Sequence, residues 1–93
     1  MPNARILIVE DEPLIALDTK KTLEDMEFQV TALAHSAEEA IHSVEKDTPD
    51  LILMDILLGG EVDGIETVRT IHSRYDIPVI YMTANADADI VKR

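Results

Sequence analysis

Three short, wholly apolar runs divide the chain and predict strands. They are ILIV, LILM and VIYM, at residues 6–9, 51–54 and 79–82. Continuous apolar runs of about four to six residues, without alternation, are typical of strands that are covered on both faces. We therefore expect these segments to form the centre of a parallel sheet.

A fourth segment has a different pattern. In FQVTAL, residues 28–33, every second position is apolar on one face, carried by Phe28, Val30 and Ala32. Alternation of this kind predicts a strand that lies nearer the edge of the sheet.

Helical spacing fills the intervals between these strands. A first helix is predicted from Pro13 to about Glu27, since proline suits a first turn, where the amide needs no helical partner. The residues expected on its inward side are Ile15, Ala16, Thr22, Leu23 and Met26.

Ser36 is followed three residues later by Glu39, which is the pattern of a capping box and predicts the start of a second helix. Its expected inward residues are Ala37, Ala40, Ile41 and Val44. A third helix is predicted within DGIETVRTIHSRY, residues 63–75, with Asp63 as N-cap and with Ile65, Val68 and Ile71 directed inward.

Strands that alternate with helices of this length predict an α/β fold, because parallel strands need right-handed helical crossovers. We expect one open parallel sheet in a single domain over residues 1–93. The last ten residues, ANADADIVKR, read as a loop entering another helix, so the domain is expected to be incomplete at its C-terminal end.

The composition of the chain excludes several classes of function and of site. The formal net charge is -11, from 19 acidic against 8 basic residues, which opposes direct binding to nucleic acid or to an anionic membrane. There is no cysteine, so disulfides and thiolate metal sites are excluded. The N-terminal MPNARILIV is too short an apolar stretch for a signal peptide or a membrane span, and we expect a cytoplasmic protein.

Polar side chains follow each apolar run. Glu10, Asp11 and Glu12 come after the first run, Asp55 after the second and Thr83 after the third. Ligands of open parallel sheets bind at the carboxyl ends of the strands. Carboxylates about 4 Å apart repel by about 1 kcal/mol per pair in water, and a divalent cation removes this penalty. Oxygen ligands suit Mg²⁺, which usually accompanies phosphate chemistry.

Asp55 is then a candidate nucleophile toward phosphorus, with backbone amides after Asp55 and Thr83 to hold phosphoryl oxygens. Other readings of these residues stay open. Asp11 could simply cap the first helix, and Thr83 could be structural. The three histidines, His35, His42 and His72, are expected to be solvated surface residues.

The pattern ILIVEDEP, LILMDILL, DGIE and IPVIYMTA resembles the receiver domain of two-component response regulators, from about Arg5 to the end of the chain. The resemblance implies a flavodoxin-like, doubly wound sheet that lacks its fifth strand and fifth helix here. It implies a regulatory module rather than an enzyme, phosphorylated on Asp55 by a sensor histidine kinase or a phosphotransfer protein.

The resemblance also assigns individual roles. Asp11 would ligate Mg²⁺ directly and Glu10 through water, with Asp55 and the backbone carbonyl of Leu57 completing the ligands. Thr83 would be the switch hydroxyl. The amides of Ile56, Leu57 and Ala84 would hold phosphoryl oxygens.

Some family features fall outside the pattern. The resemblance implies a lysine on a fifth strand that pairs with the phosphoryl group, and Lys92 does not match it. The strand at residues 79–82 would then be an apolar edge, open to a homodimer or a domain swap. The resemblance also implies that the residue two positions after Asp55, here Leu57, influences how readily water attacks the acyl phosphate. Because the apolar Leu57 cannot orient a water by hydrogen bonding, the phosphoryl group is not expected to be among the shortest-lived.

Two alternatives have different consequences. An aspartyl-phosphate phosphatase would want an acid two residues after the nucleophile, where this chain has Leu57. A degenerate receiver acting only as an interaction scaffold would not need the intact acid set. The glycine-rich loop at residues 58–61 lacks the lysine and hydroxyl residue of a P-loop, so nucleotide binding is not supported.

Overall fold

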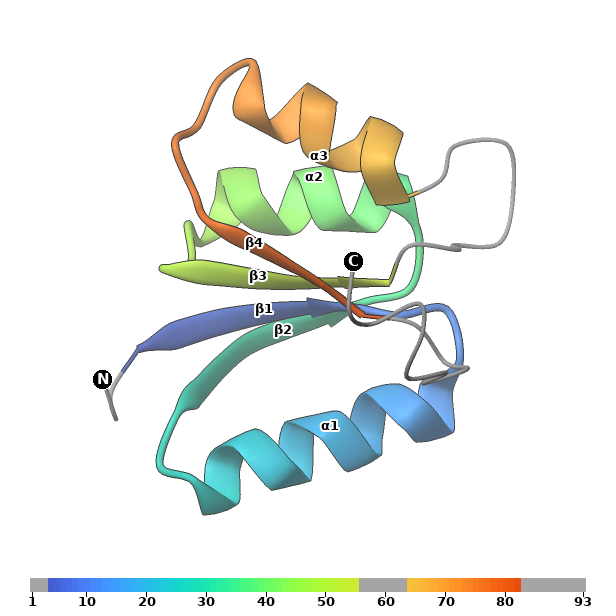
Figure 1. Ribbon diagram of the computed structural model, residues 1–93, viewed down its shortest axis with the longest axis vertical. Coiled ribbons are helices and arrows are strands. Elements are labelled where there is room, and N and C mark those ends of the chain that lie inside the picture. The colour runs from blue at the N-terminus through green and yellow to red at the C-terminus, as the bar shows by residue number, and fades with distance from the viewer. Residues whose placement is uncertain (1–3, 56–63, 83–93) are drawn as a thin grey trace.

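The computed structural model describes residues 4–55 and 64–82, which form a parallel sheet between two helical layers (Figure 1). Helix α1 covers one face of the sheet, and helices α2 and α3 lie side by side over the other. Along the chain the elements are β1 (Arg5–Val9), α1 (Pro13–Asp25), β2 (Gln29–Ala34), α2 (Ala37–Lys46), β3 (Leu51–Asp55), α3 (Gly64–His72) and β4 (Val79–Met82).

The strand order is β2-β1-β3-β4, and every pair is parallel. This confirms the predicted fold class, a doubly wound, flavodoxin-like open sheet. The first and second apolar runs are the central strands β1 and β3, as expected. Within the described residues β4 lies at an edge, where Ile80 and Tyr81 are 52% and 42% exposed. The apolar pattern of the third run suggested a central position, which is wrong, whereas the edge position that the family resemblance implied agrees with the structure.

Alternation along the strands divides the apolar side chains between the two faces. Leu7 and Val9 of β1 belong to the main core, which lies beneath α2 and α3. The side chains of Ile6 and Ile8 are equally buried but point to the opposite face, toward α1 and its one buried residue, Ala16. The other buried members of the main core are Ala34, Ala40, Val44, Ile52, Met54, Val68, Ile71 and Ile77.

Strand β2 contains an irregularity that the sequence did not predict. Ile6 pairs with Val30 but Leu7 pairs with Ala32, so Thr31 is an extra residue on β2. Paired residues share a face, so Val30 and Ala32 lie on opposite faces. The prediction that Phe28, Val30 and Ala32 share one face is therefore wrong, and Phe28 precedes the strand.

Helix α1 ends earlier than expected, at Asp25, in a Schellman motif. The amide of Phe28 donates to the Leu23 carbonyl at 3.0 Å, and that of Glu27 donates to Glu24 at 2.9 Å. Glu27 has a positive φ of 71°. Because the chain reverses here, Met26 lies beyond the helix and is 57% exposed, so its predicted inward position is wrong. Thr22 is also exposed.

Helix α3 buries Val68 and Ile71 as predicted, but Ile65 is 49% exposed. At 100° per residue Thr67 lies about 40° from Ile71 around the helix, whereas Ile65 lies about 120° away. Thr67 accordingly takes the inward position and is fully buried. The predicted cap at Asp63 and the helix predicted within residues 84–93 lie outside the described residues.

The start of α2 agrees with the prediction. The Ser36 hydroxyl oxygen accepts a hydrogen bond from the Glu39 amide at 3.2 Å. The Glu39 carboxylate accepts from the His35 amide at 3.3 Å, one residue before the expected partner. None of the helices in the described part of the chain has the length and hydropathy that crossing a membrane requires.

Candidate metal centre

Strand register brings the candidate acids together at the carboxyl ends of β1 and β3. Val9 pairs with Ala34 on one side and with Met54 on the other. The next residue of each strand or its extension is therefore His35, Glu10 and Asp55, in that order across the sheet. Two of the predicted acids thus become neighbours although 45 positions separate them in the sequence.

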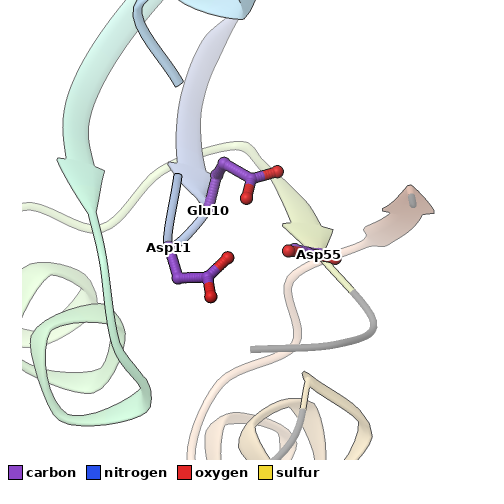
Figure 2. Close-up of side chains that lie close together, drawn as sticks. All are labelled: Glu10, Asp11 and Asp55. Carbon is purple, nitrogen blue, oxygen red and sulfur yellow. The ribbon is translucent and has the colours of Figure 1, made fainter. Parts of the chain in front are cut away.

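The carboxylates of Glu10, Asp11 and Asp55 form one cluster (Figure 2). One carboxylate oxygen from each lies within 4.8 Å of the others. Glu10 and Asp55 are 1% and 2% exposed, while Asp11 is more open to solvent. The structure therefore confirms that these three acids converge, which was expected from their positions after the strands.

The electrostatics of the cluster centre on Glu10. The pKa of its carboxyl is raised from 4.5 to about 7, chiefly by burial and also by the neighbouring carboxyl groups of Asp11 and Asp55, against the lowering effect of a hydrogen bond from the Glu12 amide. Without a cation, the folded chain holds a proton on Glu10 at mildly acidic pH.

The turn after β1 carries the acids and starts α1. Oε2 of Glu10 accepts from the Glu12 amide at 3.0 Å. Glu12, rather than Asp11, occupies the N-cap position, and its side chain makes no capping hydrogen bond. Its carbonyl accepts the first helical bond, from Ala16 at 3.0 Å. Helix capping therefore does not account for Asp11, and its carboxylate remains directed into the cluster (Figure 2).

The cluster suits a small divalent cation. Oxygen ligands of octahedral Mg²⁺ at about 2.1 Å lie at most about 4.2 Å apart. The three carboxylate oxygens lie within 4.8 Å of one another, which is close to that limit. A cation here would neutralise carboxylates that otherwise raise the pKa of Glu10.

Four candidate residues, Ile56, Leu57, Thr83 and Ala84, lie outside the described residues. His42 is exposed, as predicted. His72 is also exposed as a residue, but its Nε2 lies 2.8 Å from the carbonyl oxygen of Ile77. His35 is only partly exposed, and its Nδ1 lies 3.0 Å from the carbonyl oxygen of Glu10, so its assignment as a solvated residue is wrong. The signal that could have found it is its position directly after a strand that pairs with β1.

These features define a class: an open parallel α/β sheet with an acidic cluster at the carboxyl ends of its two central strands. The sequence profile of the response regulator receiver domain matches residues 6–93. The chain belongs to this family, whose members are regulatory modules.

Individual relatives support the assignment. Transcriptional regulatory protein YvrH of Bacillus subtilis is 41% identical over 90 residues, covering 96% of this chain and 38% of that protein. The crystal structure of the response regulator PhyR from Brucella abortus superposes with a TM-score of 0.83 at 39% identity, covering 88% of this chain and 34% of that one.

A further structure, of the anti-anti-sigma factor PhyR from Bartonella quintana complexed with the anti-sigma factor NepR, has a TM-score of 0.79 at 38% identity and covers 85% of this chain and 33% of that one. The chain spans 30 to 43% of the length of the curated relatives that it matches.

Proposed function

We propose that the chain is a phosphoacceptor module, in which Asp55 receives a phosphoryl group with Mg²⁺ held by Glu10, Asp11 and Asp55. The observation that carries this proposal is the convergence of the three carboxylates within 4.8 Å at the ends of adjacent strands. Buried acids in such proximity destabilise a fold unless a cation or proton compensates them, so their presence favours a function that uses a cation.

The proposed donor is a phosphohistidine of a sensor kinase or phosphotransfer protein. A carboxylate oxygen of Asp55 forms the new bond to phosphorus as the phosphorus–nitrogen bond breaks, and the leaving imidazole keeps the electron pair. Mg²⁺, when bound, would neutralise the carboxylates and the phosphoryl oxygens. The roles of Thr83 as switch hydroxyl and of the amides of Ile56, Leu57 and Ala84 remain predictions from the family resemblance.

Described residues prepare Asp55 for this role in two ways. Its position at the last residue of β3, paired with Met82, fixes its backbone in the sheet. Its low exposure limits the access of bulk water, which would otherwise hydrolyse an acyl phosphate. Glu10 lies beside Asp55, and its carboxylate accepts a hydrogen bond from the Glu12 amide. This hydrogen bond holds the turn that carries Asp11.

The proposed output is a change in protein partners, since a phosphorylated receiver acts by shifting a two-state equilibrium. A histidine kinase is the proposed upstream partner, with a cytoplasmic location to match, and we propose no direct contact with nucleic acid. The half-exposed Ile80 and Tyr81 on β4 mark the edge on which a further strand or a second copy could pair.

The test uses the full-length protein that carries this chain, incubated with acetyl phosphate and Mg²⁺ and then weighed by mass spectrometry. We expect a gain of one phosphoryl group that is lost in Asp55→Asn or when EDTA removes the metal. Asp18→Asn is the matched control, because it removes an exposed carboxylate of α1 that is remote from the cluster.

The same experiment separates the alternatives. No gain in the wild-type protein, or a gain that persists in Asp55→Asn, contradicts the proposal and favours an interaction scaffold. Continuous turnover of a phosphomonoester would favour the phosphatase instead.

A further inference from the structure

Both backbone groups of Glu10 are bound by the end of β2. Its amide donates to the carbonyl oxygen of Ala34 at 2.9 Å. The carbonyl oxygen of Glu10 lies 3.0 Å from Nδ1 of His35, the residue that follows Ala34. A carbonyl oxygen can only accept a hydrogen bond, so Nδ1 of His35 must carry the hydrogen and donate it.

His35 is itself fixed by the first turn of α2. Its amide donates to Oε1 of Glu39 at 3.3 Å, and the amide of Glu39 donates to the Ser36 hydroxyl oxygen at 3.2 Å. The imidazole is partly buried. The backbone of the residue whose side chain holds the Glu10 carbonyl is thus anchored to the first turn of a helix.

The irregularity in β2 determines which residue stands beside Glu10. Ile6 pairs with Val30, and an unbroken register from that pair would place Ala34 level with Glu10. The extra residue, Thr31, advances β2 by one position, so Ala34 pairs with Val9 and His35 follows level with Glu10. An imidazole donor therefore replaces a methyl group at this point of the sheet.

The peptide group that His35 holds is the one that joins Glu10 to Asp11. A peptide group is planar, so fixing the direction of the Glu10 carbonyl fixes the direction of the Asp11 amide and restricts where the Asp11 side chain can point. Residues that orient metal ligands through hydrogen bonds commonly set metal affinity.

We propose that His35 is a positioning residue of the metal centre: its Nδ1–H orients the peptide group between Glu10 and Asp11, and thereby the carboxylates that bind Mg²⁺. This inference rests on the proposed function, because it assumes that the cluster binds Mg²⁺. It goes beyond that function by assigning a role to a residue that neither belongs to the cluster nor follows from the family pattern.

The test compares His35→Ala with His35→Asn. The side-chain amide of asparagine places a donor close to where Nδ1–H lies, whereas alanine removes it. Mg²⁺ binding is measured by calorimetry on the full-length protein at about pH 8, above the pKa of about 7 of Glu10. We expect His35→Ala to weaken Mg²⁺ binding about tenfold, within the range of substitutions that disturb ligand orientation, and His35→Asn to restore most of it.

The control is His42→Ala, an exposed histidine on α2, which should leave the affinity unchanged. Circular dichroism and urea unfolding show whether each variant is folded, and rescue by asparagine separates positioning from a general loss of stability. Heteronuclear NMR of the imidazole nitrogens should also show His35 of the wild-type protein as the Nδ1–H tautomer.

The outcomes are distinct. A wild-type protein that binds no Mg²⁺ overturns the proposed function and this inference with it. Wild-type binding that is unchanged in a folded His35→Ala variant overturns the inference alone, as does an Nε2–H tautomer at His35. If His35→Ala does not fold, the inference is decided by His35→Asn and by the tautomer.

Discussion

Glu10 and Asp55 are both buried, and they lie next to each other at the carboxyl ends of β1 and β3, with carboxylate oxygens within 4.8 Å. Strand register alone produces this relationship, because Val9 pairs with Met54. Two buried acids at this spacing cannot both ionise without cost, so a proton or a cation must be associated with the pair. The behaviour of the chain with pH and with Mg²⁺ follows from that competition.

The stability of the metal-free protein should fall as the pH rises from about 4.5 to about 7. Burial raises the pKa of Glu10 to about 7 in the folded chain, while the unfolded chain releases this proton near 4.5. The folded state therefore binds more protons than the unfolded state in this window, so the contribution of Glu10 to the free energy of unfolding decreases with rising pH. Urea unfolding at a series of pH values, with EDTA present, measures this change in the free energy of unfolding.

Glu10→Gln isolates this contribution from that of the other titrating groups. Glutamine keeps an oxygen that accepts from the Glu12 amide but has no charge to bury. The free energy of unfolding of the variant should be close to that of the wild type near pH 4.5 and higher by about 1 to 3 kcal/mol at about pH 8. A difference that does not grow with pH contradicts the assignment.

Mg²⁺ binding should have the opposite dependence on pH, because the cation competes with the proton on Glu10. Below the pKa of about 7, the apparent affinity should weaken with falling pH, by up to about tenfold per pH unit. Calorimetric titration between mildly acidic and mildly basic pH measures this slope. An affinity that stays constant through the window would show that Glu10 does not take part in binding.

Asp11→Asn should remove Mg²⁺ binding while leaving the fold intact, since Asp11 is partly exposed and does not cap α1. One charge at about 4 Å, at an effective dielectric of about 20, contributes about 4 kcal/mol. We therefore expect at least about a hundredfold weaker binding. Glu12→Gln is the control: it removes the adjacent charge at the N-cap and should change the affinity by less than about threefold. Equal losses of Mg²⁺ affinity in both variants would mean that the overall negative charge, and not ligation by Asp11, determines binding.

The central strands and their terminal acids could be predicted because each rests on a local signal. A continuous apolar run marks a strand covered on both faces, and parallel strands present their carboxyl ends at one edge. The sequence therefore predicts the positions of Asp55 and Asp11 at the strand ends without knowledge of register.

The failures at Thr31 and His35 have a different cause, since each depends on a fit between distant segments, whereas the failure at Ile65 depends on angular position around α3. Nothing in QVTALA marks Thr31 as the extra residue, because the pairing with β1 decides it. Ile65 is exposed because Thr67 lies closer to the buried line of α3. The bond from His35 to the Glu10 carbonyl joins residues 25 positions apart, and it exists only because of the irregularity at Thr31.

Glu27→Gly should stabilise the protein. Glu27 directly follows Met26, the C-cap residue of α1, and has a φ of 71°, in the left-handed region, where a Cβ atom costs about 1 kcal/mol and glycine has no such cost. We expect a gain of about 1 kcal/mol in the free energy of unfolding, measured in urea. Glu27→Ala separates this effect from the loss of a negative charge, since alanine retains the Cβ atom. Glu24→Gly, three residues earlier within the helix, should instead lose about 1 kcal/mol. Equal effects of glycine and alanine at position 27 would show that charge, and not backbone conformation, governs this site.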